Sequence, residues 1–324
     1  MLPIRDNISS RSYPVVNQVL IGVNILVFLI QLAHGTEVHR FNITYGLVPA
    51  RFSNPALSSY FGLWSNLFSL LSFMFLHGGF WHIISNMWSL HIFGDNVEDR
   101  MGPIRYLAFY LAAGMLSGLT HLFFNVHSDI PTIGASGAVS GVMGAYFILF
   151  PSARILTLIP IIIIPWIVEI PAFFFIGFWF LMQFLNATGP AAASTGVAWW
   201  AHVGGFLFGI VLLKVFQRIP ESGLSRTLRP ATARKKSHRM QVIHPDAPET
   251  APDLHGTLRL TPFEALTGTQ KAVTVSRGLH SRRLRVTVPA GVKEGGTLRL
   301  KGVGNPLPDG TRGDLLLKIE LESW

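Results

Sequence analysis

The sequence contains no cysteine among its 324 residues. This absence excludes disulfide bonds, thiol nucleophiles and cysteine-ligated zinc. Charged residues are also scarce, at 13% of the chain, whereas hydrophobic residues make up 49% and the mean hydropathy is +0.41. These values lie outside the range that is usual for soluble domains. The composition therefore predicts a membrane protein.

Apolar stretches long enough to cross a bilayer occur six times. A hydrocarbon core of about 30 Å needs roughly 20 helical residues. The first stretch lacks the small-residue cleavage site of a signal peptide, so we expect it to be retained. The predicted spans are 15–34, 66–93, 104–126, 134–150, 166–186 and 198–216. They predict an all-α polytopic membrane domain with six transmembrane helices over residues 1–216.

Charge is divided unevenly along the chain. Residues 1–213 hold seven Lys or Arg and seven Asp or Glu, so the net charge of +9 comes from residues 214–324. Most basic residues of the membrane part precede the first span, lie between the second and third, or follow the fourth. The positive-inside rule then places both termini in the cytoplasm, with Arg40 and Arg51 as exceptions in the first outer loop. We expect a multi-pass protein of a bacterial inner (plasma) membrane.

The tail is predicted to be a linker followed by a small all-β domain. Residues 217–256 are rich in Pro, Ser, Arg and Thr and lack apolar periodicity, which is typical of a basic flexible linker. From residue 257, short alternating runs are separated by Gly, Pro and Asp turns, which indicates β-strands. These runs are TLRLT, AVTV, LRVTV, TLRL and DLLLKIEL.

Three motifs of the tail match a known domain. Pro289-Ala290-Gly291, the run 298–302 and Gly313-Asp314-Leu315 make residues 257–324 resemble the client-binding β-subdomain of DnaJ-type co-chaperones. The resemblance implies a β-sandwich that accepts an extended peptide by strand addition. A structural or dimerising role is the alternative. The chain has no His-Pro-Asp tripeptide, so stimulation of an Hsp70-class ATPase is not implied.

Two glycine-bearing spans carry the candidate catalytic pair. The fourth span opens with Gly134-Ala135-Ser136-Gly137, and the sixth contains "AHVGGFLFG", which places His202 near its outer start. Small residues of this kind also serve simple helix packing. Both spans run inward, so Ser136 and His202 lie at similar depth. A hydroxyl beside an imidazole is what an activated serine nucleophile needs.

A third pair of polar residues lies in the second span. His82 and Asn86 are four residues apart and so share one helical face. Polar groups inside lipid are costly unless that face looks into a protein cavity. Their donors could stabilise an oxyanion together with the backbone N–H of Ser136. The alternative is an interhelical hydrogen bond without a catalytic role.

Together, these motifs closely resemble the rhomboid intramembrane serine proteases. The resemblance implies cleavage of transmembrane substrate proteins near the outer end of their helix. It assigns Ser136 as nucleophile, His202 as general base, and His82, Asn86 and the Ser136 N–H as oxyanion donors. The segment "YGLVPARF" in the first outer loop is also family-like and accounts for Arg51 on the unexpected side. Ser140 stands where some relatives carry an aromatic residue, so the packing that holds the base is not predicted.

The sequence predicts a Ser-His dyad rather than a triad. Asp95 and Glu169 lie at the cytoplasmic ends of their spans, too far along the helix to reach His202. Asp129 is on the outer side but seven residues before Ser136. No H-E-x-x-H motif is present, so neither a metal nor another cofactor is predicted. An inactive membrane-anchored chaperone or peptide-binding protein is the alternative function. The predicted partners are transmembrane substrates, the lipid bilayer and extended peptides at the tail, with no nucleic acid.

Overall fold

The computed structural model describes residues 2–8, 10, 12–161, 164–189, 196–220, 240–243, 251–277, 280–307 and 311–321. They belong to two compact units, Met1–Arg234 and Lys235–Trp324, and each is considered by itself. Most of the predicted linker 217–256 and the middle of the loop 187–197 lie outside the described residues.

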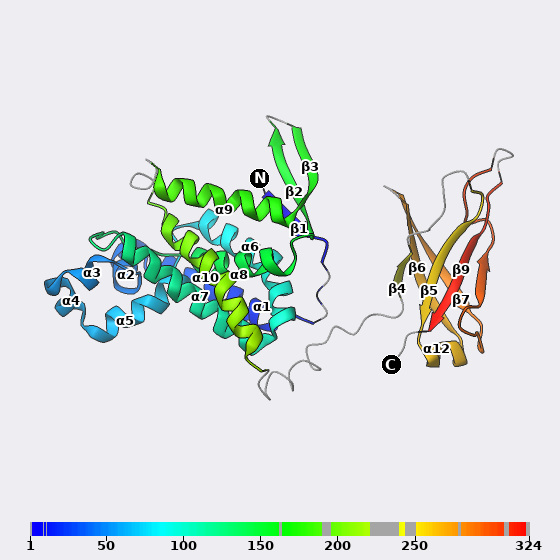
Figure 1. The fold of residues 1–324 in the computed structure, drawn as a ribbon, viewed down its shortest axis with the longest axis horizontal. Coiled ribbons are helices and arrows are strands. Elements are labelled where there is room, and N and C mark those ends of the chain that lie inside the picture. The colour runs from blue at the N-terminus through cyan, green and yellow to red at the C-terminus, as the bar shows by residue number, and fades with distance from the viewer. Residues whose placement is uncertain are drawn as a thin grey trace. The chain divides into compact units, whose positions relative to one another are not determined.

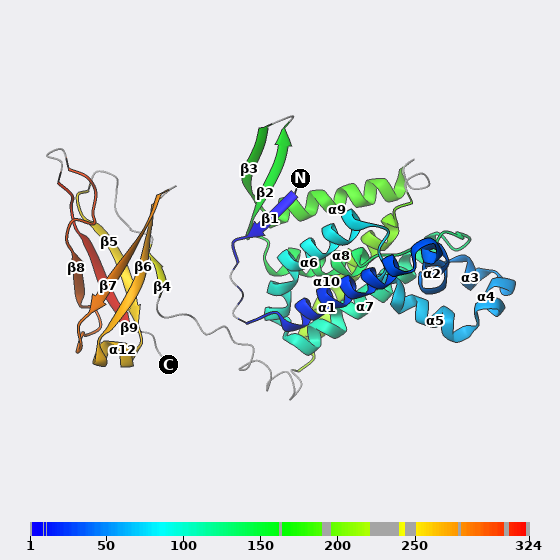
Figure 2. The same cartoon turned by 180° about the vertical axis from the view of Figure 1, so that it is seen from behind.

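The first unit is a helical bundle with a small sheet beside it (Figures 1 and 2). Among the described residues, three of its helices are long and apolar enough to cross a membrane. These are α1 (Val15–Ala33), α7 (Pro103–Phe124) and α10 (Trp199–Arg218). The helices α8 (Ser136–Leu149) and α9 (Ala172–Thr188) are apolar but shorter, with 14 and 17 residues. The described helices therefore support a membrane protein. They do not confirm the predicted six spans, because α8 and α9 are shorter than a typical membrane-spanning helix.

The predicted second span, 66–93, is broken into two helices. α5 (Leu63–Ser72) continues into η2 (Phe73–Phe75), and α6 (Phe80–Met101) follows at a bend of 79°. The break contains Gly78 and Gly79, which lack side chains that would restrict the backbone. If the bent pair counts as one span, the described residues contain four. The bend places His82 in the first turn of α6.

The prediction of a helix from residue 166 was wrong at its start. The strands β2 (Arg154–Ile161) and β3 (Ile164–Pro171) pair in antiparallel fashion, and β1 (Leu2–Asp6) adds a third strand in the order β1-β2-β3. Isoleucines and a valine favour strands, and proline lacks the N–H that a helix interior needs. The helix α9 begins at Ala172, directly after Pro171, so β3 adjoins its start (Figure 1).

The segment between α1 and α5 forms the short helices α2 (Val38–Tyr45), α3 (Ala50–Ser53) and α4 (Pro55–Phe61). Arg51 is fully buried there, and its guanidinium donates to the carbonyl oxygens of Ile43 and Thr44. Its charge lies 3.4 Å above the Phe61 ring. Burial lowers the pKa of Arg51 to about 10. These contacts use the Arg51 side chain to hold the helices of this segment together.

The helix α8 lies at the centre of the first unit. All residues from Gly137 to Tyr146 are buried. The hydrophobic core around it takes side chains from α1, α6, α7, α9 and α10. A short central helix of small residues lets its neighbours approach closely. The start of α8, where Ser136 lies, is thus held by surrounding helices.

The second unit is a small β-sandwich. One sheet has the order β4-β6-β7, with β4 (Met240–Ile243), β6 (Thr269–Arg277) and β7 (His280–Val288). The other has the order β5-β9-β8, with β5 (Leu254–Leu260), β8 (Thr297–Leu300) and β9 (Leu315–Leu321). Aliphatic side chains from both sheets share one core. The prediction of strands from the alternating runs is confirmed, and β4 lies within the predicted linker.

Candidate active site

Ser136 and His202 are brought together by α8 and α10. The Ser136 Oγ lies 2.8 Å from the His202 Nε2, which is hydrogen-bonding distance. Ser136 is the first residue of α8, and His202 lies in the first turn of α10. Both side chains are half-buried. The arrangement allows the imidazole to accept the hydroxyl proton.

The two helices pack through opposed glycine pairs. Gly137 and Gly141 of α8 face Gly205 and Gly209 of α10. A Cβ added to Gly205 would lie 2.1 Å from the Gly137 carbonyl oxygen, and one added to Gly209 would lie 2.2 Å from that of Gly141. Both contacts are with backbone, which cannot move aside as a side chain can. The distance between Ser136 and His202 therefore depends on these glycines.

The other nitrogen of His202 contacts a residue that the sequence analysis missed. The His202 Nδ1 lies 2.9 Å from the Gln183 Oε1. Gln183 comes from α9 and is buried. The rings of Trp179 and Trp199 flank the imidazole at centroid distances of 6.2 Å and 6.0 Å. Gln183 is one of two side-chain amides in "FFFIGFWFLMQFLNAT", and this was the available signal, because a polar group in an apolar span needs a partner.

Ser140, which stands where some relatives carry an aromatic residue, makes a hydrogen bond within α8. Its Oγ donates to the Ser136 carbonyl oxygen at 2.6 Å, within α8. The imidazole is instead supported by Gln183 and the two tryptophans. The residues that pack against His202, which the sequence did not predict, therefore belong to α9 and to α10 itself.

His82 approaches the start of α8. Gly134 has a φ of +135°, and a Cβ there would lie 2.8 Å from the His82 Nε2 and 3.6 Å from the Ser136 Oγ. A glycine is therefore required for His82 to lie so close to the serine. The His82 Nδ1 accepts a hydrogen bond from the Gly78 N–H at 3.2 Å, so its Nε2 carries the ring proton.

Asn86 contributes an unpaired donor. It is buried, and its Nδ2 has no hydrogen-bond partner among the described residues. A buried amide without a partner is costly, and such groups are found at functional sites. The backbone N–H groups at the start of α8 also have no acceptor within their helix. The His82 ring and the N–H groups at the start of α8 are suited to hold a negatively charged oxygen near Ser136, and Asn86 lies one helical turn further along α6.

Carboxylates do not contact His202 in the described part of the chain. Asp95 lies 13 residues after His82 on α6, about 20 Å along the helix at 1.5 Å per residue. Glu169 is in β3, where it pairs with Arg154 at 3.5 Å, and Asp129 is exposed in the loop before α8. Within the described ranges, no group of three or more His, Asp or Glu could hold a metal ion.

Two family models match this chain, and one of them covers the candidate site. Residues 64–219 match the family model described as the Rhomboid domain. The chain contains a rhomboid domain. Residues 254–323 match a second family model, the DnaJ C terminal domain. The serine, the histidine and both oxyanion candidates lie within the rhomboid domain.

Three relatives of the rhomboid domain illustrate the similarity. The chain is 28% identical over 222 residues to Rhomboid protein 1, mitochondrial, of Saccharomyces cerevisiae, covering 65% of this chain and 56% of that protein. It is 30% identical over 196 residues to the rat Presenilin-associated rhomboid-like protein, mitochondrial, covering 59% and 46%. It is 29% identical over 141 residues to the rhomboid protein YdcA of Bacillus subtilis, covering 43% and 64%.

The chain thus spans about half to two thirds of the length of these relatives. Two of the three are mitochondrial proteins by name. The comparisons therefore do not support the expectation of a bacterial plasma membrane. They support a membrane protein with apolar helices.

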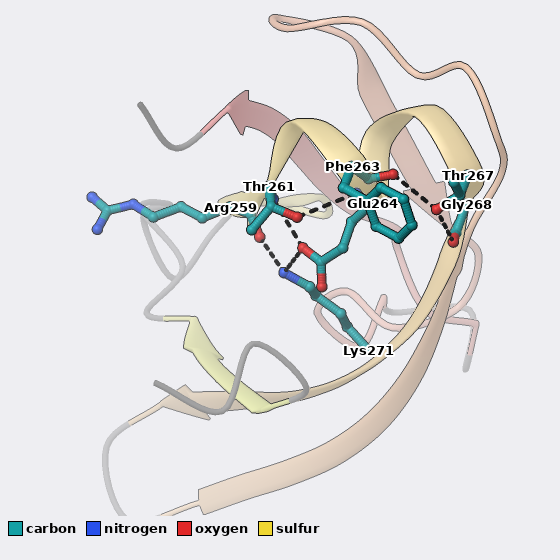
Figure 3. Close-up of polar contacts among 7 residues, drawn as sticks. All are labelled: Arg259, Thr261, Phe263, Glu264, Thr267, Gly268 and Lys271. Carbon is teal, nitrogen blue, oxygen red and sulfur yellow. Dashed lines mark hydrogen bonds and ion pairs between the residues drawn. The ribbon is translucent and has the colours of Figure 1, made fainter. Parts of the chain in front are cut away.

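The DnaJ-type unit has its own buried polar cluster (Figure 3). The Lys271 Nζ lies 2.9 Å from the Glu264 carboxylate and donates to the Arg259 carbonyl oxygen at 2.7 Å. Glu264 and Thr261 form a capping box at the start of α12 (Pro262–Thr267). Burial raises the pKa of Glu264, but hydrogen bonds from Lys271 and Thr261 outweigh it and lower the pKa overall. This cluster fixes α12 to the sheet of β6.

Proposed function

We propose that the chain is an intramembrane serine endopeptidase that cleaves transmembrane proteins near the outer end of their helix. Proteins with a rhomboid domain are generally intramembrane serine proteases. The observation that carries the proposal is the 2.8 Å contact between the Ser136 Oγ and the His202 Nε2 on two closely packed helices. A Ser-His dyad is a recognised variant of the catalytic triad.

In the proposed reaction, His202 takes the Ser136 proton as the Oγ attacks the scissile carbonyl carbon. The carbonyl oxygen becomes an oxyanion, which the Ser136 N–H, His82 and Asn86 stabilise with hydrogen bonds. His202 then gives the proton to the leaving amine, and the C–N bond breaks. Water, activated by the same imidazole, hydrolyses the acyl-enzyme and restores the serine.

The proposed topology has six crossings, with both termini on the side that carries the basic residues. Long helices α1, α7 and α10, the bent pair α5–α6, and the shorter helices α8 and α9 supply these crossings. Lys214 and Arg218 at the end of α10 and Arg5 before α1 lie on the same side under this scheme. Ser136 and His202, at the starts of α8 and α10, then lie near the opposite surface.

Cleavage of a labelled transmembrane reporter by the purified protein tests the function. Wild type, Ser136→Ala and His202→Ala are compared in liposomes, each with and without a metal chelator. We expect wild-type cleavage that survives chelation and is lost in both variants. Cleavage by Ser136→Ala would rule out the proposed nucleophile. Inactivity of all three proteins would favour a membrane-anchored, peptide-binding protein without protease activity.

For the tail, we propose binding of extended peptide segments of substrates or partners. The DnaJ C-terminal match supports this, as do the sheet edges at β7 and β8 among the described strands, because a peptide can extend a sheet at its edge. A tethered binding unit raises the local concentration of its ligand. Deletion of residues 235–324 should slow cleavage of a reporter that has a long extension on the tail's side and leave a short reporter unaffected. Equal effects on both reporters would contradict this role.

A further inference from the structure

The side chain of Gln183 links α9 to the candidate base. Its Oε1 lies 2.9 Å from the His202 Nδ1, and its Nε2 lies 3.2 Å from the Trp179 carbonyl oxygen. The side chain is buried within the predominantly apolar α9. Both ends of its amide are thus engaged, one by the imidazole and one by the backbone of its own helix.

These contacts determine which nitrogen of His202 carries the proton. The Trp179 carbonyl oxygen can only accept a hydrogen bond, so the NH2 group of Gln183 must face it. The amide oxygen, which can only accept, therefore faces the His202 Nδ1, and this nitrogen must be the N–H donor. In the neutral imidazole, the Nε2 is then the acceptor, and it is the nitrogen that faces the Ser136 Oγ.

We propose that Gln183 is a positioning residue that holds His202 in the tautomer able to accept the serine proton. The proposal rests on the proposed function, in which His202 is the base. Gln183 performs through a neutral amide what a buried aspartate does in a Ser-His-Asp triad: it orients the ring and supports the imidazolium that forms. Because Gln183 comes from α9, the chemistry depends on a third helix besides α8 and α10.

A fluorophosphonate probe measures this effect without a protein substrate. The Ser136 Oγ bonds to phosphorus, the P–F bond breaks, fluoride leaves, and the hydroxyl proton moves to the His202 Nε2. Without a partner at Nδ1, the imidazole also populates the tautomer whose Nε2 is protonated and cannot accept that proton. The labelling rate therefore reports the fraction of His202 whose Nε2 is free to accept the serine proton.

The decisive comparison uses Gln183→Met, which keeps the unbranched shape without the amide. We expect its labelling rate to fall by about 10- to 100-fold, the range for removing a partner that orients a metal-bound histidine. Reporter cleavage should lose kcat with little change in KM. The control is Asn186→Leu on the same helix, which should label at the wild-type rate. Among the described residues, the Asn186 amide donates to the Met182 carbonyl oxygen and makes no hydrogen bond with His202.

Gln183→Glu tests direct contact with the imidazole. Its carboxylate can still accept from Nδ1, so labelling should recover relative to Gln183→Met. A negative charge favours the imidazolium, so the acidic limb of the pH–rate profile should move to higher pH. Among the described residues, His82 of α6 and His121 of α7 are the other titratable groups that interact electrostatically with His202. Both are present in every variant, so a shift between variants reports the residue at position 183.

Two results would overturn the inference. One is wild-type labelling of Gln183→Met, and the other is a Gln183→Glu protein that labels no faster than Gln183→Met. Either result leaves the proposed function intact if the wild type still labels at Ser136. Failure of the wild type to label or to cleave would instead contradict the proposed function itself. The two failures are therefore distinguishable.

Discussion

Replacing Gly205 with alanine should separate Ser136 from His202 without changing either residue. The new Cβ would lie 2.1 Å from the Gly137 carbonyl oxygen and 2.9 Å from its carbonyl carbon. Carbon and oxygen atoms that are not bonded to each other rarely approach closer than 3.0 Å, so α8 and α10 must move apart by about 1 Å. The Ser136–His202 contact, now 2.8 Å, would then exceed hydrogen-bonding distance.

The expected loss is about 100-fold in kcat, since a misplacement of about 1 Å can cost that much. The assay is cleavage of the transmembrane reporter, with detergent-solubilised protein checked for folding by thermal unfolding and gel filtration. Gly22→Ala is the matched control, because no atom lies within 4 Å of its added Cβ. A folded Gly205→Ala protein with wild-type kcat would refute the argument that this glycine contact sets the catalytic distance.

Three further predictions follow from other contacts. Asn86→Leu should lower kcat by about 100- to 1,000-fold with little change in KM if its unpaired amide stabilises the oxyanion, as steady-state cleavage kinetics would show. Lys271→Met should destabilise the DnaJ-type unit by about 3 kcal/mol, measured by pulse proteolysis of the full chain in urea, because the partly buried Glu264 loses its partner. The stability that Glu264 supplies in the wild type should be present at neutral pH and decline as pH falls below 4.5 through its lowered pKa, and Glu264→Gln should remove this dependence. An unchanged unfolding midpoint in Lys271→Met, or an equal acid response in Glu264→Gln, would contradict the account of this cluster.

Motifs of small and polar residues pointed to Ser136 and His202, which the structure brings into contact, but not to Gln183. Ser136 and His202 could be paired because each begins a glycine-bearing apolar stretch and because the predicted spans alternate in direction. The depth of both residues then followed from topology. Their roles remain predictions until activity is measured.

Gln183 was missed because its importance depends on tertiary packing. One amide in an apolar helix indicates a hydrogen bond but does not identify the partner. The start of α9 was misplaced for a related reason, since a run of isoleucine, valine and proline satisfies the hydropathy of a span while favouring a strand. Its pairing with Leu2–Asp6 is a contact between distant parts of the sequence, which local patterns do not reveal.

Mapping the covalent adduct of a fluorophosphonate probe by mass spectrometry tests the central claim most directly. The account predicts one modified site in the wild type, on the peptide that contains Ser136, and loss of that modification in His202→Ala. An active protein that cleaves the reporter but carries no adduct at Ser136, or carries one at another residue, would contradict the assignment of Ser136 as the nucleophile.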